Sequence, residues 1–276
     1  MTYDLHTHSS ASDGAYPPAE LVRQAHAGGV THLALSDHDC TNGLAEARAE
    51  ADALGLALIP AVEISTSWHG KSVHIIGLNI DPASPELCEG LGRLQALRLT
   101  RAEEMGRRLA KAGILGGFEA ASALAGAGMI TRTHFARFLY AQGLAGSVRD
   151  VFDHYLVQGK PGYVPTEWAT LDEAIHWIKR AGGVAVVAHP QRYKLSNSWL
   201  GRLLVEFKAA GGEALEVVTG NAGPGDIQSS ASAARRHGLL ASVGSDFHSP
   251  DNIWLKMGRL APLPADLTPV WSLWHG

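Results

Sequence analysis

Short apolar runs alternate with longer helical patterns along most of the chain. The first apolar run, Tyr3–Leu5, precedes a helical pattern at Pro18–Ala27 that ends at a pair of glycines. His32–Ser36 then predicts a strand, and Gly43–Leu54 predicts a second helix that ends at Gly55. Short runs of β-branched and aliphatic residues are typical of buried strands, whereas longer periodic stretches are typical of helices.

The same alternation continues after these elements and returns in the last third of the chain. Further strands are predicted at Leu56–Ile64, Ser72–Ile80, Val184–Ala188, Leu215–Val218 and Leu240–Val243. Helices near the later strands are predicted at Leu171–Arg180, Trp199–Ala210 and Asp226–His237. Strands that alternate with helices predict the α/β class, with a mostly parallel sheet that is either open or closed into a barrel.

Residues 84–168 interrupt this alternation. They contain no strong strand pattern, whereas Glu86–Ala112 and Thr133–Gln142 are helical in pattern. We therefore predict one α/β domain from residues 1–83 and 169–276, with a helical insertion at 84–168. The insertion also concentrates arginines, and the simplest reading of each is a solvated helix face: Arg93, Arg98, Arg101, Arg107, Arg108, Arg132 and Arg137.

The composition is typical of a globular protein with a sizeable core. The chain has 276 residues and a mass of 29.3 kDa, and 46% of its residues are apolar but only 18% are charged. No apolar run approaches the roughly 20 residues that a membrane helix needs, and the N-terminus lacks a signal-peptide pattern. Its two cysteines, Cys40 and Cys88, are typical of a reducing compartment. We therefore expect a cytoplasmic protein that does not contact a membrane.

Charge and histidine content narrow the candidate chemistry. A net charge of −4 argues against binding long double-stranded nucleic acid by charge alone. The 14 histidines, by contrast, are more than half as many as the 23 lysines and arginines. Histidine is the commonest protein ligand for transition metals, so the positions of these residues deserve comparison with the predicted strands.

Side chains that can ligate a metal lie in or after six of the predicted strands. The first strand leads into His6 and His8, which project to the same side of an extended chain, and Asp13 follows in a turn. Because the carboxyl ends of strands form the ligand face of α/β sheets and barrels, we expect these groups to converge. The other strands carry Asp37, His38 and Asp39, then Glu63 at a strand end, His74, His189, Asp246 and His248.

The combined set of candidate ligands is more specific for a metal site than any single pair of them. One His-x-His pair or one Asp-x-His pair is only weakly specific for a metal site. Two such pairs at opposite ends of the chain, with four more strand-associated ligand groups, predict a metal centre. Imidazole and carboxylate without thiolate favour Mn²⁺, Zn²⁺ or Fe²⁺ over a thiolate-type structural zinc site.

The remaining histidines have weaker patterns. His134 follows Arg132 and lies between threonines and a helical pattern, so it is either a substrate contact or part of a helix N-cap. The other seven are expected to have structural or surface roles: His26, His32, His69, His154, His176, His237 and His275.

Seven segments of the sequence together resemble the PHP superfamily, named for polymerase and histidinol phosphatase. They are DLHTHSSASDG, LALSDHD, AVEIS, VHIIGL, TRTHFA, AHP and GSDFH, and they extend from residue 4 to residue 248. The resemblance is strongest to a stand-alone bacterial branch of 3',5'-nucleoside bisphosphate phosphatases and 5'-3' exoribonucleases. It implies a distorted (β/α)7 barrel with a helical insertion that covers the active site. It also implies three divalent ions, with Mn²⁺ foremost and Zn²⁺ or Fe²⁺ as alternatives.

The resemblance further implies a role for individual residues. The first ion would be held by His6, His8, Glu63 and Asp246, the second by Glu63, His74 and His189, and the third by Asp13, His38 and His248. The substrate would contact Asp13, His38, Arg98, Arg101, Arg132 and His134. Some PHP proteins have a histidine where this chain has Asp13, and the carboxylate is a feature of this branch.

The implied chemistry is hydrolysis of a phosphate ester by a hydroxide that bridges two metal ions. The third ion would offset charge on the phosphoryl group in the transition state. Asp246 would accept the proton of the attacking water, and His38 or His248 would protonate the leaving oxygen.

Three functions are compatible with these residues. The first is removal of the 3'-phosphate from 3',5'-nucleoside bisphosphates, such as adenosine 3',5'-bisphosphate, with the 5'-phosphate held bidentately by arginines of the insertion. The second is 5'-3' hydrolysis of short 5'-phosphorylated RNA. The third, from another class, is a non-catalytic metal-binding module, which the complete ligand set disfavours. The oligomeric state is left open.

Overall fold

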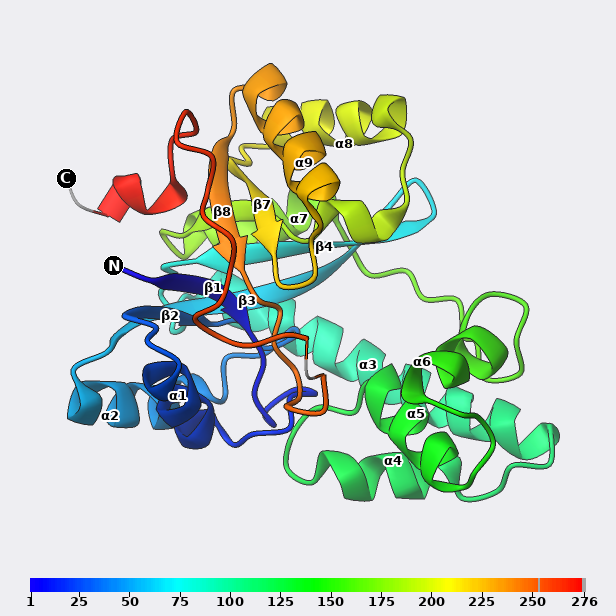
Figure 1. Ribbon diagram of the computed structural model, residues 1–276. Coiled ribbons are helices and arrows are strands. Elements are labelled where there is room, and N and C mark those ends of the chain that lie inside the picture. Colours follow the sequence, from blue (N-terminus) through cyan, green and yellow to red (C-terminus); the bar gives the residue numbers. More distant parts are fainter. Residues whose placement is uncertain (253, 275–276) are drawn as a thin grey trace.

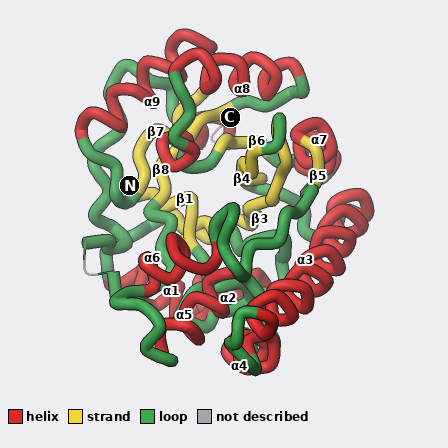
Figure 2. The backbone as a smooth tube through the Cα atoms, turned by 90° about the vertical axis from the view of Figure 1, so that its right-hand side faces the viewer, coloured by secondary structure: helices red, strands yellow, loops and turns green. Residues whose placement is uncertain are grey.

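The strands form one sheet that nearly closes into a barrel, as Figure 2 shows for this computed structural model. The structure describes residues 1–252 and 254–274, so the expected surface role of His275 lies outside the described residues. A bridge between Thr7 and Phe247 brings the two ends of the sheet together, and the α/β barrel prediction is confirmed. The strand order is β1 (Tyr3–Thr7), β2 (His32–Leu35), β3 (Ala57–Trp68), β4 (Lys71–Leu78), β6 (Val184–Val187), β7 (Ala214–Thr219) and β8 (Leu240–Gly244), and β5 (Ala169–Thr170) pairs with β3.

The β3–β4 hairpin gives the barrel its irregular part. Strand β4 pairs antiparallel with both β3 and β6, whereas β1–β2, β2–β3, β6–β7 and β7–β8 are parallel pairs. The prediction that this strand ends near Glu63 is wrong, because β3 continues to Trp68. It continues because β4 supplies a hydrogen-bonding partner for its whole second half, with Ser65 opposite His74. Glu63 therefore projects from the middle of β3, close to the strand that carries His74.

Five helices cover the outside of the barrel (Figures 1 and 2). Local signals define their ends: Thr170 and Glu173 form a capping box at the start of α7, and Gly55 ends α2 in the left-handed conformation, with φ of 68°. These helices agree with the predicted ones to within two residues at each end. They are α1 (Pro18–Ala27), α2 (Leu44–Leu54), α7 (Leu171–Arg180), α8 (Asn197–Ala209) and α9 (Pro224–His237).

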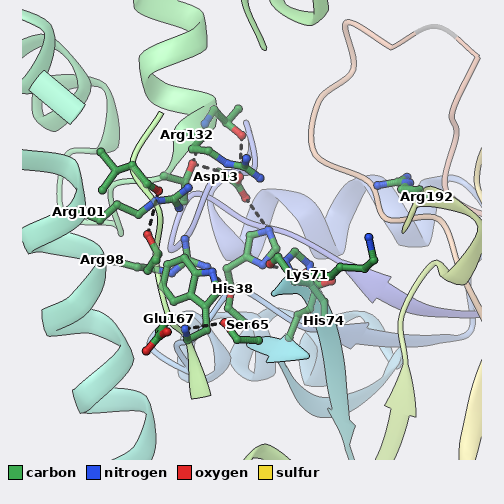
Figure 3. A pocket seen from close by; sticks show the side chains of 18 of the residues that line it. Asp13, His38, Ser65, Lys71, His74, Arg98, Arg101, Arg132, Glu167 and Arg192 are labelled. Carbon is green, nitrogen blue, oxygen red and sulfur yellow. Dashed lines mark hydrogen bonds and ion pairs between the residues drawn. The ribbon is translucent and has the colours of Figure 1, made fainter. Parts of the chain in front are cut away.

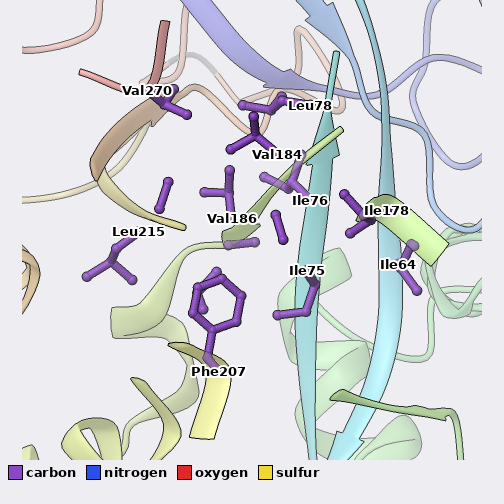
Figure 4. Close-up of a cluster of buried hydrophobic side chains, with 14 of the residues drawn as sticks. Ile64, Ile75, Ile76, Leu78, Ile178, Val184, Val186, Phe207, Leu215 and Val270 are labelled. Atoms are coloured by element: carbon purple, nitrogen blue, oxygen red, sulfur yellow. The ribbon is translucent and has the colours of Figure 1, made fainter. Parts of the chain in front are cut away.

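The larger apolar core packs the sheet against α7, α8 and α9 (Figure 4), whereas α1 and α2 pack against β2 in a separate cluster. Ile75 and Ile76 of β4 point to opposite faces of the sheet, and both are fully buried. Phe207 of α8 and Ile178 of α7 close the core from the helix side. Each such side chain contributes on the order of 1.5–3 kcal/mol when it leaves water, so the strands under the ligand groups form a rigid support.

Helices and loops fill the segment between β4 and β5. They have an apolar cluster of their own, in which Phe135, Leu139 and Leu156 are fully buried. The helical insertion is therefore present, while its boundaries at residues 84 and 168 stay a prediction. No described helix is long and apolar enough to cross a membrane. The elements are α3 (Pro85–Lys111), α4 (Gly117–Ala125), α5 (Arg132–Ala141), α6 (Val148–Val151) and the π-helical turn η1 (Phe152–Leu156).

Helix α3 connects the two apolar cores. One buried stripe runs along it at helical spacing: Leu87, Leu91, Leu94, Arg98, Ala102, Met105 and Leu109. The first three side chains pack in the barrel core, and the last three pack in the core of the helical segment. Arg98 is the charged member of this stripe, at the crossing point between the two cores. The helix thereby carries a buried cation to the edge of the barrel.

Candidate metal centre

The predicted ligand side chains converge at one end of the barrel. Three overlapping groups of His, Asp and Glu have ligand atoms within 4.8 Å of one another. The first contains His6, His8, Glu63 and Asp246; the second contains His38, Glu63 and His74; the third contains His8, Asp13, His38 and His248. Eight of the nine predicted ligands are in these groups, and the ninth, His189, lies beside the second group. The arrangement is consistent with several metal ions.

The first group is the most deeply buried of the three. The Nε2 atoms of His6 and His8 lie 3.0 Å apart, and each lies 3.1–3.3 Å from one oxygen of Glu63 and one oxygen of Asp246. All four side chains are buried. Two nitrogen lone pairs and two carboxylate oxygens that face one point in this way form a ligand set for a divalent transition metal.

Glu63 joins the first group to the second. Its Oε2 atom faces His6 and His8 and lies 2.9 Å from His38 Nδ1. Its Oε1 atom lies 2.9 Å from His74 Nδ1 and 3.0 Å from His189 Nε2. One carboxylate thus offers separate oxygens to two neighbouring sets of imidazoles, which is the arrangement that bridging of two ions requires.

The third group lies nearer the surface. Asp13 Oδ1 is 3.3 Å from His248 Nε2 and 3.9 Å from His38 Nε2. His248 donates from Nδ1 to the backbone carbonyl of Asp246 over 2.9 Å, which fixes the ring orientation and leaves Nε2 directed at Asp13. His38 therefore stands between Glu63 and Asp13, and it connects the buried groups to the outer one.

Buried oxygens in these groups lack protein hydrogen bonds. Asp13 Oδ1, Glu63 Oε2 and Asp246 Oδ1 are buried, and none accepts a hydrogen bond from a described residue. A buried carboxylate oxygen without a partner is costly, and the three oxygens are the atoms that face the imidazoles. The residues present therefore fit divalent cations as their missing partners.

Electrostatics keeps the carboxylates ionised. Burial would raise the pKa of Glu63 and Asp246, but the facing imidazoles, and Arg192 beside Asp246, hold both pKa values well below the ordinary range. Burial would lower the pKa of His8, but the facing carboxylates of Asp246 and Glu63 raise it to about 10. Metal binding requires neutral imidazole, so a cation held by His8 would take the place of this proton.

Glu216 supports two ligands from behind, and the sequence patterns did not identify it. It lies in β7 and is fully buried. Its Oε1 accepts a hydrogen bond from His6 Nδ1 over 3.0 Å, and its Oε2 accepts one from the backbone N–H of His189 over 2.6 Å. The sequence feature that could have identified Glu216 is its position as an acidic residue inside the apolar run Ala214–Val218. A carboxylate that is buried in a strand needs polar partners.

The carboxylates that flank His38 organise the loops around the centre. Asp37 accepts hydrogen bonds from the hydroxyls of Ser9 and Ser12 and so orders the turn after β1. Asp39 accepts one from the backbone N–H of Ser65 over 2.7 Å and pairs with Arg98. Neither is in a ligand group, although both follow the same predicted strand as His38.

The backbone is strained where ligands leave the strands. Asp39, His189 and Asp246 have positive φ angles of 49°, 26° and 53°. Non-glycine residues adopt this region rarely, and the strain persists only where surrounding contacts hold it. Gly244 is needed for another reason: a Cβ atom there would overlap His6 and Glu216.

A cavity of about 710 Å³ lies beside the ligand groups, between the barrel and the helical segment (Figure 3). Figure 3 shows Arg98 and Arg101 on one side of it and Lys71 and Arg192 on the other, with His38 between them. A ligand in the cavity can therefore touch the metal centre and arginines of the helical segment at the same time.

Arg98 is already engaged by protein groups. It donates from Nε to Asp39 Oδ2 over 2.7 Å and from Nη2 to Ser65 Oγ over 2.8 Å, and it is only 7% exposed. Its guanidinium lies 5.0 Å from the ring centre of Trp168. These contacts indicate that Arg98 stabilises the cavity wall, and they leave it less available to bind a substrate directly.

Arg101 and Arg132 differ from Arg98 because neither pairs with a carboxylate of the described residues. Burial and the charges of Arg132 and Arg98 lower the pKa of Arg101 to about 9, and burial also lowers the pKa of Arg132. The Arg101 Nε atom is buried without a hydrogen-bond partner. Two inward cations, neither in an ion pair with a carboxylate of the described residues, form a ready anion site, although the charge of Asp13 acts on Arg132.

His134 is part of a helix cap. Thr131 is the N-cap residue of α5, and its backbone N–H donates to His134 Nδ1 over 3.0 Å in a capping box. The hydroxyls of Thr131 and Thr133 donate to Asp13 Oδ2. His134 is buried and does not line the cavity, so the N-cap alternative describes its position. A substrate contact by His134 stays a prediction that this geometry does not favour.

Arg192 is a cavity residue that the sequence patterns missed. It lies in the 3-10 turn η2 (Pro190–Tyr193), three residues after His189, and its Nη1 pairs with Asp246 Oδ2. Its side chain is 45% exposed and lines the cavity. A cation two residues after the His-Pro dipeptide of a strand end was the sequence feature that could have identified it.

Comparison with known proteins gives consistent similarities. The PHP domain family matches residues 4–180. The chain is 47% identical to a 3',5'-nucleoside bisphosphate phosphatase of Chromobacterium violaceum, over 97% of this chain and 94% of that protein. It is 48% identical to the 5'-3' exoribonuclease Rnm of Escherichia coli, over 100% and 94% respectively. A solved structure of an amidohydrolase from Chromobacterium violaceum, with bound sulfate and no metal, superposes with a TM-score of 0.94 at 46% identity, over 99% and 95% of the two chains.

Proposed function

Because the chain belongs to the PHP domain family, we propose that its cavity hydrolyses the phosphate ester of a small nucleotide that carries a second phosphate. The chain is a metal-dependent phosphoesterase, similar to the named bisphosphate phosphatase over nearly its whole length. The single observation that carries the choice of substrate is the pair Arg101 and Arg132, which lies in the same cavity as the ligand groups. The favoured reaction removes the 3'-phosphate from a 3',5'-nucleoside bisphosphate and yields the 5'-monophosphate.

The metal assignment is part of the proposal. Three divalent ions, with Mn²⁺ as the first choice, would be held by the nine predicted ligands: His6, His8, Asp13, His38, Glu63, His74, His189, Asp246 and His248. Such ions supply Lewis acidity, which lowers the pKa of water and offsets the charge that a phosphoryl group gains in the transition state. The imidazole and carboxylate donors suit Mn²⁺, Fe²⁺ or Zn²⁺.

The chain's own residues divide the remaining work. Asp246 is ionised and can accept a proton at a carboxylate oxygen, and the neighbouring Arg192 keeps it in that state. Arg192 also lines the cavity, where its remaining N–H groups can hold an oxygen of the reacting phosphate. His38 and His248 are candidates for protonating the leaving oxygen. Burial lowers the pKa of His38 to about 4. The His248 side chain is the more exposed of the two, at 28% against 12% for His38.

The distal phosphate would lie between Arg101 and Arg132. Both guanidinium groups are held by aromatic rings, Arg101 at 5.2 Å from the ring centre of Trp168 and Arg132 at 5.7 Å from that of Phe152. A dianionic phosphate there would relieve the repulsion between the two cations. Binding energy from this remote group can then be used to position the reacting phosphate at the metal centre.

A second candidate, 5'-3' hydrolysis of short 5'-phosphorylated RNA, has specific support. The exoribonuclease Rnm is as similar to this chain as the bisphosphate phosphatase is. The two reactions use the same groups, because an anchored 5'-phosphate and a reacting 3'-phosphate occur in both. They differ in whether a further nucleotide follows the reacting phosphate.

The proposal is tested by product analysis with Mn²⁺-loaded protein. The substrates are adenosine 3',5'-bisphosphate, the 3'- and 5'-monophosphates, histidinol phosphate and a short 5'-phosphorylated RNA. We expect phosphate and 5'-monophosphate from the bisphosphate, at a higher kcat/KM than from either monophosphate. Glu63→Gln should abolish this turnover, while Glu213→Gln, at an exposed ion pair with Lys179, should retain it. Release of no product from any of these esters would reject the function.

A further inference from the structure

The surface beyond the Lys71 side of the cavity carries an exposed indole among cations. We propose that this surface binds the downstream nucleotides of a single-stranded RNA whose 5' end lies in the cavity, an inference that rests on the proposed function. We call it the downstream surface and define it as Lys71, Trp199 and Arg202. It would add binding energy for RNA chains that an isolated bisphosphate cannot use.

Trp199 is built as a stacking platform. It lies in the first turn of α8, remains 39% exposed, and contacts the ring of Trp68 edge to face, with ring centres 5.5 Å apart at 87°. Trp68 is 4% exposed and donates from its indole nitrogen to Glu206 Oε2 over 2.7 Å. Arg202 donates to the other oxygen of Glu206 over 2.9 Å. The exposed indole is therefore held by a buried partner and a polar brace, as a base-stacking residue must be.

Cations lie beside this indole. Lys71 Nζ is 6.0 Å from the ring centre of Trp199, and the Arg202 guanidinium is 5.6 Å from it. Lys71 is exposed, and it forms no ion pair within the described part of the chain. An available ammonium group near an aromatic ring matches the alternation of phosphate and base along a single strand.

The downstream surface continues from the cavity. Lys71 lines the cavity wall, and Figure 3 places it with Arg192 on the side opposite Arg98 and Arg101. In sequence, the stretch that leaves the metal centre at His189 passes Arg192 and Lys194 and reaches Trp199 ten residues later. The exposed ring of Trp199 thus lies beside Lys71, a residue of the cavity wall.

The direction of a bound strand follows from the two ends of the cavity. A 5'-phosphate at Arg101 and Arg132 and a reacting phosphate at the ligand groups leave the rest of the chain to exit toward Lys71. A nucleoside bisphosphate ends at the reacting phosphate and does not reach Trp199. The downstream surface should therefore affect only substrates that extend beyond that phosphate.

The test compares Trp199→Ala with wild type on two substrates, adenosine 3',5'-bisphosphate and a 5'-phosphorylated hexaribonucleotide, with Mn²⁺-loaded protein. One base–aromatic stack is worth about 5- to 100-fold in affinity, so we expect kcat/KM on the hexamer to fall about tenfold. We expect kcat/KM on the bisphosphate to change less than about twofold, and Trp199→Phe to restore most of the loss, because the ring is the acting group. Trp254→Ala, at a tryptophan that is 85% exposed, is the matched control and should behave as wild type on both substrates.

Lys71→Ala gives an independent readout. Loss of one phosphate contact to a single strand should reduce the slope of log kcat/KM against log salt by about 0.7 on the hexamer. Equal losses on both substrates in Trp199→Ala, or no loss on either, would overturn the inference. So would a wild type that hydrolyses the bisphosphate but not the hexamer, although the proposed function would then stand. A wild type that hydrolyses neither would reject the proposed function itself.

Discussion

Glu216 holds two groups of the candidate metal centre in place without belonging to it. Its oxygens accept hydrogen bonds from the ring of His6 and from the backbone of His189, and both oxygens are used. The first bond sets the tautomer of His6, so that Nε2 faces Glu63 and Asp246. The second bond holds His189 in its strained conformation. Glutamine has the same shape but is neutral. Its single oxygen can accept one of these hydrogen bonds, and its amide N–H groups would then face the second donor, where no hydrogen bond can form.

We therefore predict that Glu216→Gln weakens metal binding by about 10- to 100-fold while the protein stays folded. Competition with a chelator measures the dissociation constant directly. Turnover at saturating Mn²⁺ should recover most of its wild-type value, because the ligands themselves are intact. The exposed Glu213→Gln variant serves as the control. An unchanged metal affinity in Glu216→Gln would show that the two hydrogen bonds do not support the centre.

The buried charge of Arg101 should lower the free energy of unfolding relative to an uncharged side chain at the same position. Burial and the charges of Arg132 and Arg98 lower its pKa to about 9, whereas unfolding returns it to water and to its ordinary, higher pKa. The unfolded chain then binds this proton more tightly than the folded chain. The charged group therefore destabilises the folded state, and this penalty is fully present throughout the neutral pH range.

From this sign we predict that Arg101→Met raises the free energy of unfolding by about 0.5–2 kcal/mol near pH 7. The difference between variant and wild type should be the same at pH 6 and at pH 8, because the guanidinium stays protonated over this range. Denaturant unfolding of both proteins in buffer without phosphate measures the two differences. A gain that grows with pH, or a loss at pH 7, would contradict the assignment of an unpaired cation.

Single ligands could be predicted from the sequence because each lies at a definite place in a strand or directly after it. His6 and His8 needed only the two-residue period of a strand and the convergence of strand ends. Glu216 and Arg192 could not be assigned in this way, because their roles depend on which atoms they meet across the barrel. Arg98 was expected beside Arg101 and Arg132 as a substrate contact. Its ion pair with Asp39, which lies 59 positions away, could only come from the folded chain.

Helix α3 depends on that ion pair where its two apolar cores meet. We predict that Arg98→Met destabilises the protein by about 3 kcal/mol, because Asp39 keeps a buried charge without its counter-ion. Arg98→Met combined with Asp39→Asn should recover part of this loss, since no charge is then left unpaired. Denaturant unfolding followed by circular dichroism measures all three free energies. If Arg98→Met had the same free energy of unfolding as wild type, the ion pair between Arg98 and Asp39 would contribute nothing to stability.

The helices and strands of the barrel were predicted well because their patterns are long or bounded by clear stop signals. Helix α7, for example, has both a capping box at Thr170 and a strong apolar face. Short elements were missed: α4, α6, η1 and β5 have nine residues or fewer. Their existence depends on packing against α3 and α5, or on pairing with β3, rather than on local propensity. The full length of β3 was missed for a related reason, since β4 and not the local sequence extends it.

The barrel and the helical segment together form the walls of one cavity. How the two parts lie relative to each other could not be predicted from the sequence alone. It predicted a metal centre at one end of an α/β domain and arginines in an insertion. Which arginines face the ligand groups depends on how α3 leaves the barrel core and enters the second apolar cluster. That geometry turns Arg101 and Arg132 toward the cavity and leaves Arg107 exposed beside Glu104.

The central claim is that this cavity recognises a second phosphate with Arg101 while the metal centre cleaves the first. The most direct measurement is kcat/KM for wild type and Arg101→Ala, each with adenosine 3',5'-bisphosphate and with adenosine 3'-monophosphate. One charge-assisted hydrogen bond is worth about 1.5–3 kcal/mol, so the variant should lose about 10- to 100-fold on the bisphosphate. It should lose less than about twofold on the monophosphate, which lacks the recognised group, and Arg107→Ala should lose nothing on either. Equal losses of Arg101→Ala on both substrates would contradict the claim.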